Sequence, residues 1–502
     1  MKFLRVLLII GIIFIYITPS GADVEVYPIG DYEEKGVETA ERVYLSLNEV
    51  LGLALMNNFD IQLNLYDRKI KEADMDEEKS IYDTVLTLTG EYDYDRSEAA
   101  STILGSSSHS GSAGAKITKK LVTGTDVTID WQNTRESSDS AFTSLNPSYE
   151  SSLEMKFTQP LLRNFFGMND WGAVRITKID IDNFSSEILD KIENNLADVE
   201  KAYWDLVTAK GLVGIRRKMC SKADEFYQIN KKKKELGTSE LTDLLAAEAN
   251  RERRKSELEV EDDNLKYRTN RLKLLIDHSR GDEDILPMDS INILDREISF
   301  IQKLKTAFQN RRDYERAKNE IKAKKIKFNM KRNSRWPQLD FEGSLKLNGV
   351  ERMYKDSAAD SFTHENPEYY AKATFSFPFE DREARSEYNK AKYEKLKALL
   401  NLKKTEKTIV TEINDKVRKA NVYRDKAVRA GKIERLQREK LMEEERLFGY
   451  GRSDSDRIIR FQEDLLNAQI GTLTSLKEYK DSLIDLYLAQ NIFLKKRGLT
   501  VQ

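Results

Sequence analysis

Residues 149–163, YESSLEMKFTQPLLR, contain the change of pattern on which our prediction of the fold rests. Up to residue 157 the side chains alternate, so that Leu153 and Met155 lie on an apolar face and Glu154 lies on a polar one. Pro160 then ends the alternation, because proline has no N–H to offer to a neighbouring strand. Beyond it the apolar residues recur with helical spacing, which predicts a strand that leads into a long helix.

The same change occurs a second time at residues 369–382, YYAKATFSFPFEDR, where Pro378 stands at the corner. After each corner a glycine, Gly237 or Gly451, interrupts the helical pattern and a second helical stretch follows. We therefore predict two strands that each lead into a long helical hairpin: strands at about 148–158 and 369–379, and hairpins over 172–276 and 382–494.

The composition favours long helices over ordinary globular domains. Charged residues make up 33% of the 502 residues and hydrophobic residues 39%, with only 8 prolines. Residues 1–22 read as a secretory signal peptide with a basic start, an apolar core and small residues at its end, followed by an acidic tether over residues 23–44. Removing Lys2 and Arg5 leaves 81 basic against 85 acidic residues, which gives no reason to expect nucleic-acid binding.

The two halves of the chain read as tandem copies, over residues 45–290 and 291–502. A shift of 253 places Asn57 on Asn310 and Gly90 on Gly343, and a shift of 218 places Pro160 on Pro378. The tip glycines Gly237 and Gly451 match at a shift of 214, which is four less than the shift of the corner prolines. We therefore expect the long helix between corner and tip to be four residues shorter in the second copy. Each copy supplies a further strand, at about 84–95 and 338–347.

The first copy also contains an additional pair of alternating runs, a possible hairpin over residues 115–133. Such short strands leave edges that need partners. A soluble sandwich would satisfy them, but a secreted chain with all its strands at one end of long helices favours a membrane barrel. One chain has too few strands for a barrel of eight or more, so several chains must share one.

In the order and duplication of these elements, the sequence resembles the TolC family of outer-membrane efflux channels over nearly all of the mature chain. The matching segments are LALMNNFDI at residues 53–61, Gln159-Pro160-Leu161, Phe377-Pro378-Phe379, and the helical turn ELGTSELTDLLAAEANR at residues 235–251. The last is the most specific of them.

The resemblance implies an α+β membrane protein: a homotrimeric β-barrel to which each chain gives two strand pairs, continued by an α-helical coiled-coil tunnel across the periplasm. The 115–133 hairpin departs from that pattern. It would either widen the barrel or form an extracellular elaboration, and we favour the elaboration.

By the same resemblance, the chain is the exit channel of a tripartite efflux or type I secretion system in the outer membrane. It would contact outer-membrane lipid, a periplasmic adaptor protein and an inner-membrane transporter of the RND or ABC type. The adaptor would dock at the two hairpin tips, whose residues are Gly237, Thr238, Ser239, Thr242, Asp243, Gly451, Arg452 and Ser453. A glycine that only stops a helix, with no partner, is the alternative.

The pore entrance is a second departure. Six and nine residues after the second tip glycine, where the family can have acidic residues, this chain has Arg457 and Arg460. These two positions share one helix face, and three chains would place six positive charges around the opening, which would disfavour cations. Alternatively, both arginines face outward or pair between helices.

We find no pattern typical of catalysis, of a cofactor or of a metal site. The three histidines are scattered, and their spacing suits no zinc site. We therefore predict a passive duct and no enzyme. The alternative from another class is a secreted trimeric coiled-coil scaffold or adhesin without a pore.

Overall fold

A computed structural model describes residues 42–97, 107–140, 143–237, 240–277, 284–293 and 297–501. The chain divides into two units, one made of residues 1–42 and 281–284 and the other of the remainder. Only Arg42 and Asp284 of the first unit are described, and the fold is therefore that of the second unit. The predicted signal peptide and residues 23–41 of the predicted tether lie outside the described residues.

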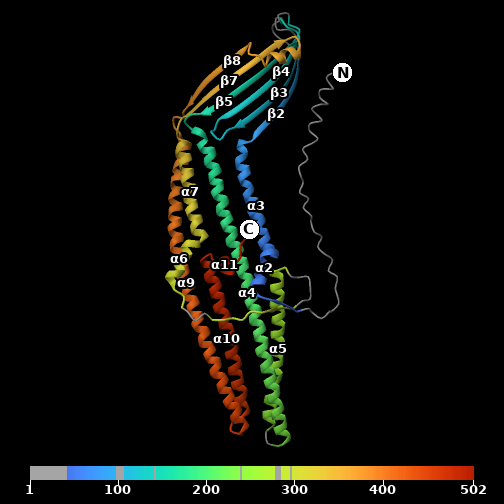
Figure 1. Cartoon of the computed structure of the whole chain (residues 1–502), viewed down its shortest axis with the longest axis vertical. Helices are drawn as coiled ribbons and strands as arrows, with labels where there is room; N and C mark the ends of the chain where they lie inside the picture. The colour runs from blue at the N-terminus through green and yellow to red at the C-terminus, as the bar shows by residue number, and fades with distance from the viewer. Residues whose placement is uncertain are drawn as a thin grey trace, which may run out of the picture. The chain divides into compact units, whose positions relative to one another are not determined.

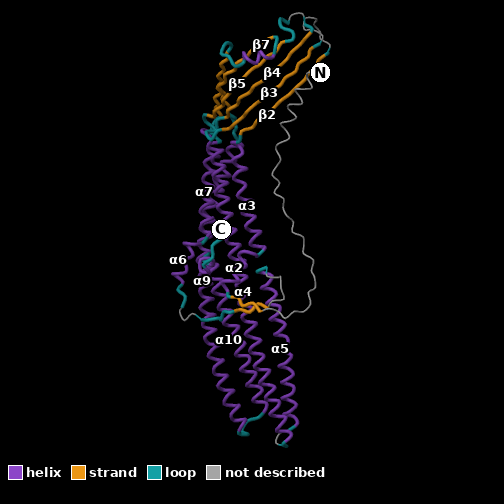
Figure 2. Tube along the Cα trace, turned by 45° about the vertical axis from the view of Figure 1, so that its right-hand side comes forward, coloured by secondary structure: helices purple, strands orange, loops and turns teal. Residues whose placement is uncertain are grey.

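The second unit combines long helices with a six-stranded sheet at one end of them (Figures 1 and 2). In chain order the elements are β1 Arg42–Leu45, α2 Leu47–Asn57, α3 Phe59–Lys79, η1 Ser80–Tyr82, β2 Thr84–Asp95, β3 Ser108–Lys120, β4 Asp126–Ser138, β5 Ser148–Pro160, η3 Phe165–Gly167, α4 Met168–Glu235, α5 Leu241–Leu275, β6 Asp284–Pro287, α6 Phe300–Asn310, α7 Arg312–Asn333, β7 Gln338–Glu351, α8 Tyr354–Asp360, β8 Pro367–Ser376, α9 Arg382–Gly449, α10 Ser455–Ala489 and α11 Phe493–Arg497.

The sheet is antiparallel throughout, with the strand order β2-β3-β4-β5-β7-β8. The hairpin that we expected over residues 115–133 is longer than predicted and consists of β3 and β4. It lies in the middle of the sheet, between β2 and β5, and is not a separate elaboration. Our preference for an elaboration separate from the sheet was wrong on this point, because every residue of both hairpin strands is paired within the sheet.

The two long helices are equally long, at 68 residues each for α4 and α9, and their return helices α5 and α10 have 35 residues each. The expected loss of four residues from the second long helix is therefore wrong. The difference lies in the connections: residues 161–167 join β5 to α4, whereas residues 377–381 join β8 to α9, so that helix α9 starts four residues closer to its proline than α4 does.

Several predicted boundaries shift by a few residues. Strand β8 ends at Ser376, which leaves Pro378 in the connection, whereas Pro160 is the last residue of β5. The last long helix ends at Ala489 and not at residue 494, because Asn491 takes a positive φ of 50° before α11 begins. The connection between β7 and β8 contains the short helix α8.

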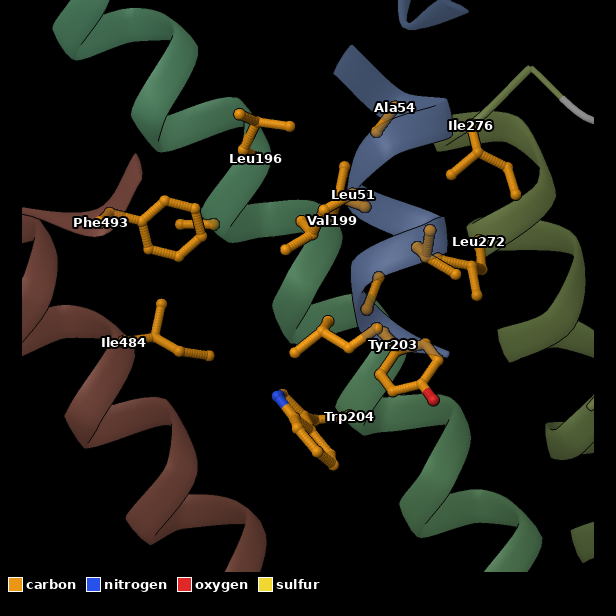
Figure 3. Packing of buried hydrophobic residues seen from close by; sticks show 14 of the residues in the cluster. Leu51, Ala54, Leu196, Val199, Tyr203, Trp204, Leu272, Ile276, Ile484 and Phe493 are labelled. Carbon is orange, nitrogen blue, oxygen red and sulfur yellow. The ribbon is translucent and has the colours of Figure 1, made fainter. Parts of the chain in front are cut away.

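The main hydrophobic core lies where α2, α4, α5, α10 and α11 meet (Figure 3). The apolar stripe that the sequence predicts on the first long helix is buried along its whole length: Ile188, Ile192, Leu196, Val199, Tyr203 and Leu206. It packs on α2 through Leu51 and Ala54 and on the chain's C-terminal region through Ile484 and Phe493. Helical spacing thus places one side of α4 in the core and leaves charged residues on the other.

Residues 284–291, around the boundary between the two halves, are fixed to this core. Strands β1 and β6 form a two-stranded sheet, although the sequence indicated only a tether over most of β1. The Tyr203 hydroxyl lies 2.7 Å from Asp289 Oδ2 and 3.1 Å from the Leu45 carbonyl oxygen. Burial and the neighbouring Asp289 carboxylate raise the pKa of the Tyr203 hydroxyl, so the hydroxyl keeps its proton to a higher pH than an ordinary tyrosine does.

A buried ion-pair cluster joins the first half of the chain to the second. Arg312 of α7 donates to both oxygens of Glu193 on α4, at 2.9 and 3.1 Å, and to Asp190 at 2.8 Å. Burial opposes the charge of Arg312, but the hydrogen bonds to these two carboxylates outweigh it and raise the pKa of the guanidinium. Since Glu193 is only 1% exposed, this pairing is protected from solvent.

We expect Glu193→Ala to destabilise the protein by about 3 kcal/mol, because it leaves the buried guanidinium of Arg312 with an incomplete set of acceptors. The melting temperature followed by circular dichroism in detergent will fall. Glu187→Ala is the matched control on the same helix, since Glu187 is half exposed and, among the described residues, forms an ion pair only with Lys191, one turn away. Equal melting temperatures for the two variants would contradict the role of the cluster.

Candidate functional site at the helical tips and the sheet edges

The two hairpin tips lie together at the end of the second unit opposite the sheet (Figure 1). A small hydrophobic cluster joins the four helix ends: Phe226 of α4, Ala247 of α5 and Ile458 of α10 are buried together, with Phe448 of α9 packed against them. The rings of Phe226 and Phe448 are 5.5 Å apart between centroids. The described parts of the two predicted tips therefore lie in a single structural region.

Both tip glycines adopt the left-handed conformation that glycine accommodates without strain. Gly237 has a φ of 70°, and its N–H donates to the Lys234 carbonyl oxygen at 3.0 Å. Gly451 has a φ of 72°, and the next residue, Arg452, donates from its N–H to the Leu447 carbonyl oxygen at 2.9 Å. These bonds satisfy carbonyl groups left free where each long helix ends.

The other predicted tip residues have different environments. Thr238 and Ser239 lie outside the described residues. Thr242 donates from its hydroxyl to Glu240 at 3.3 Å, and Asp243 stands in the first turn of α5. Arg452 is exposed. Among the described residues, the tips therefore present polar and charged side chains beside a short apolar cluster.

Hydrogen bonds across the tips connect one hairpin to the other. Ser455, in the first turn of α10, donates from its hydroxyl to Asn230 Oδ1 of α4 at 3.2 Å, and both side chains are buried. The Lys233 ammonium lies 3.8 Å from the centroid of the Phe448 ring. The two hairpins thus contact each other through side chains that the sequence did not single out.

The predicted constriction residues have unequal surroundings. Arg457 donates from Nη1 to Glu444 Oε1 at 3.3 Å across the α9–α10 turn, and Ser453 donates to the same oxygen at 2.6 Å. Arg460 is exposed and forms no ion pair with any residue in the described part of the chain. One arginine is therefore paired between helices, as the alternative interpretation expected, and the other is not.

A buried arginine above the tips was also not predicted from the sequence. Arg254 of α5 is 2% exposed; it donates to Glu257 at 2.9 Å and also to Glu463 of α10. Arg216 of α4 donates to the same Glu257 at 2.6 Å. In the sequence these residues stand among many other charges, which are typical of a solvated helix face. Only the three-dimensional contact distinguishes them.

The edges of the sheet form a second candidate surface. Strands β2 and β8 stand at its two ends, and every residue of both is exposed in a single chain. They carry large apolar side chains, among them Leu86, Leu88, Tyr92, Tyr369 and Phe375. None of the described helices is long and apolar enough to cross a membrane. In a single chain, the two edge strands thus expose both unpaired backbone groups and large apolar side chains.

We expect Glu444→Ala to loosen the second tip, because Ser453 and Arg457 lose a shared acceptor that is only 7% exposed. Loss of bonds to this charged group costs about 1.5 kcal/mol, which corresponds to roughly tenfold faster amide hydrogen exchange around residues 448–456.

Glu443→Ala is the matched control for this substitution. Glu443 is exposed and bonded to Arg446 of its own helix, which lowers the pKa of its carboxyl. Its removal leaves the contacts across the turn intact. Equal exchange in the two variants would show that Glu444 does not hold the tip.

Comparison with known proteins identifies the fold. No protein-family model matches the chain, and no curated protein matches it in sequence. Among solved structures, it is similar to the Campylobacter jejuni CmeC outer membrane channel, with 16% identity over 91% of this chain and 90% of that one and a TM-score of 0.61.

Two further structures are similar over comparable lengths. CusC is 13% identical over 92% of this chain and 95% of its own, with a TM-score of 0.65. The open state of the Neisseria gonorrhoeae MtrE outer membrane channel is 15% identical over 91% of this chain and 93% of its own, with a TM-score of 0.62. The chain therefore has the fold of the bacterial outer-membrane channels, as expected from its resemblance to the TolC family.

Proposed function

We propose that the chain is an outer-membrane channel that acts as a passive export duct, with three copies closing one barrel in the membrane and one helical tunnel in the periplasm. Its fold supports this proposal. The observation that carries it is that apolar residues of neighbouring strands lie directly opposite one another across the whole sheet. In antiparallel strands, directly paired residues share a face. Two registered rows cross all six strands: Leu86, Ile117, Ile129, Met155, Leu345 and Tyr369; and Leu88, Ala115, Trp131, Leu153, Leu347 and Pro367.

Between these two apolar rows, the opposite face carries a polar row: Thr87, Lys116, Asp130, Glu154, Lys346 and Glu368. Lys156 and Glu342 of the same face form an ion pair at 2.9 Å. A sheet with a two-row apolar band on one face and a charged row on the other suits a barrel wall, with lipid outside and water inside. Six strands are too few to close such a barrel alone, so copies must share it.

The geometry of the edges favours closure between copies. Strand β2 leaves the helices and β8 returns to them, so β8 of one copy can pair antiparallel with β2 of the next. This pairing can satisfy the edge groups along the length that the two strands share, as the hydrocarbon layer requires. The fold shared with outer-membrane channels supports three copies. In this assembly the hairpin tips reach into the periplasm, where we propose that a periplasmic adaptor docks and an inner-membrane transporter supplies the energy.

The direct test is the assembly and conductance of the purified mature chain. We expect a trimer in detergent that conducts ions in planar bilayers. A water-soluble monomer that binds neither detergent nor vesicles would refute the proposal, and a soluble trimer without conductance would favour a secreted scaffold or adhesin instead.

Substitution of Leu88 by lysine tests which face of the sheet meets lipid. Leu88→Lys places a charge in the apolar face and should cost about 2–4 kcal/mol if that face lies in hydrocarbon. Membrane-inserted trimer will then decrease strongly. Thr87→Lys is the matched control, because Thr87 is adjacent in β2 and lies on the polar face. In a soluble protein both changes would be tolerated, since Leu88 is already 61% exposed in a single chain.

The two arginines near the second tip should affect ion preference unequally. Because Arg457 is paired with Glu444 and Arg460 forms no ion pair in the described chain, Arg460→Ser should reduce the preference for anions more than Arg457→Ser does. Reversal potentials measured across a salt gradient check this. Unchanged potentials in both variants would show that neither side chain lines the entrance.

A further inference from the structure

We propose that the hairpin formed by β3 and β4 enlarges the barrel, so that three copies close a wall of eighteen strands, one third of it built from these hairpins. The inference rests on the proposed trimeric channel. Two strand pairs per chain, as the resemblance to the TolC family implied, would give twelve strands. This chain has six strands in one sheet.

The first argument is that the hairpin continues both faces of the wall. On the apolar side, Ile117 and Ile129 extend the row between Leu86 and Met155 without a gap. On the polar side, Lys116 and Asp130 are direct partners whose charged groups lie 3.8 Å apart. A hairpin projecting into water would need neither the uninterrupted apolar row nor the register with β2 and β5.

The second argument is that the turn of the hairpin is built into the end of the helical region. Gly124 in this turn and Gly167, just before α4, both have positive φ, and their backbones touch. A Cβ atom on Gly124 would lie 2.7 Å from the Gly167 nitrogen, and one on Gly167 would lie 2.8 Å from the Val122 carbonyl oxygen. Neither position has room for a side chain.

Polar contacts reinforce the same junction. Lys120, at the end of β3, forms an ion pair with Asp170 of α4 at 3.0 Å. Gln159 near the end of β5 donates to the Thr123 carbonyl oxygen at 3.3 Å and accepts a hydrogen bond from the Thr125 hydroxyl. The turn is therefore held by both the neighbouring strand and the following helix.

The junction also accounts for the unequal connections between strand and helix. The first half of the chain has four more residues between its corner proline and its long helix than the second half has. These residues include η3 and Gly167, on which the hairpin turn rests. The second half has only the strands β7 and β8 in its described residues, so no hairpin turn packs against its shorter connection. The additional strands and the longer connection thus belong to one arrangement.

The expected consequence is a wider barrel. With strands about 4.8 Å apart and tilted by about 40°, eighteen strands give a backbone diameter of roughly 36 Å, and twelve give roughly 24 Å. The cross-section enclosed by the backbone therefore increases about twofold. The larger lumen would lie at the membrane end of the duct, with the charged face of the sheet as its lining.

Electron cryo-microscopy of the wild-type trimer in lipid nanodiscs tests the inference by a direct count of strands. We expect eighteen strands and a diameter close to 36 Å. A trimer with a closed twelve-stranded barrel and the hairpins outside the wall would overturn the inference and leave the proposed channel intact. Failure to form any membrane trimer would refute the proposed function itself.

A deletion variant provides a second measurement. Replacing residues 96–147 by a short glycine–serine turn removes β3 and β4 and joins β2 directly to β5. Strands β2 and β5 run in opposite directions in the sheet, because two strands lie between them, so a turn can connect them as an antiparallel pair. We expect this variant to form a barrel of twelve strands, about two thirds as wide as the wild type. A variant barrel as wide as the wild-type barrel would contradict the inference. If the variant does not fold, the strand count of the wild type still decides.

Discussion

The structure depends on one constraint, the need of the two edge strands for hydrogen-bond partners. Strands β2 and β8 expose their whole length, and between them the apolar rows run without interruption. In hydrocarbon an unpaired N–H or C=O costs several kcal/mol, so a sheet of this kind is stable there only when its edges meet. An even number of strands makes the two edges run in opposite directions. Each copy can therefore extend the sheet of the previous one by the same antiparallel pairing, until the last edge meets the first and the ring closes.

The helical part meets a different requirement, since its helices are surrounded largely by water. Charged or polar groups make some of the contacts between helices, and their partners lie on other helices. Arg312 with Glu193, Arg254 with Glu463, and Ser455 with Asn230 are examples of such pairs. Each pair would cost free energy if one partner were removed, so these contacts specify which helices pack together.

Much of the fold follows from periodicity alone. Alternation in residues 149–157 locates β5, and the spacing of Ile188, Ile192 and Leu196 identifies the buried side of α4. Strand β3 was harder to predict, because its sequence SHSGSAGA has few large apolar residues and resembles a loop. Its register is fixed by β2 and β4 on either side, and such long-range pairing leaves little trace in a short window of sequence.

The details at the tips were predictable only in part. The positive φ of Gly237 and Gly451 follows from the need of a helix end for a residue without a side chain. The pairing of Arg457 does not, because Glu444 is one of many acidic residues on α9 and becomes its partner only through the turn. Sequence spacing also could not distinguish a shorter helix from a shorter connection, since both displace the same glycine by four residues.

The contact between Gly124 and Gly167 makes two distant segments of the gene dependent on each other. A related protein without the β3–β4 hairpin would have no use for the long connection between β5 and α4. A protein with a shorter connection would lack the residues against which the hairpin turn packs. Substitution of either glycine would force the two backbones apart. The pair should therefore be inherited together, so that close relatives carry both features or neither.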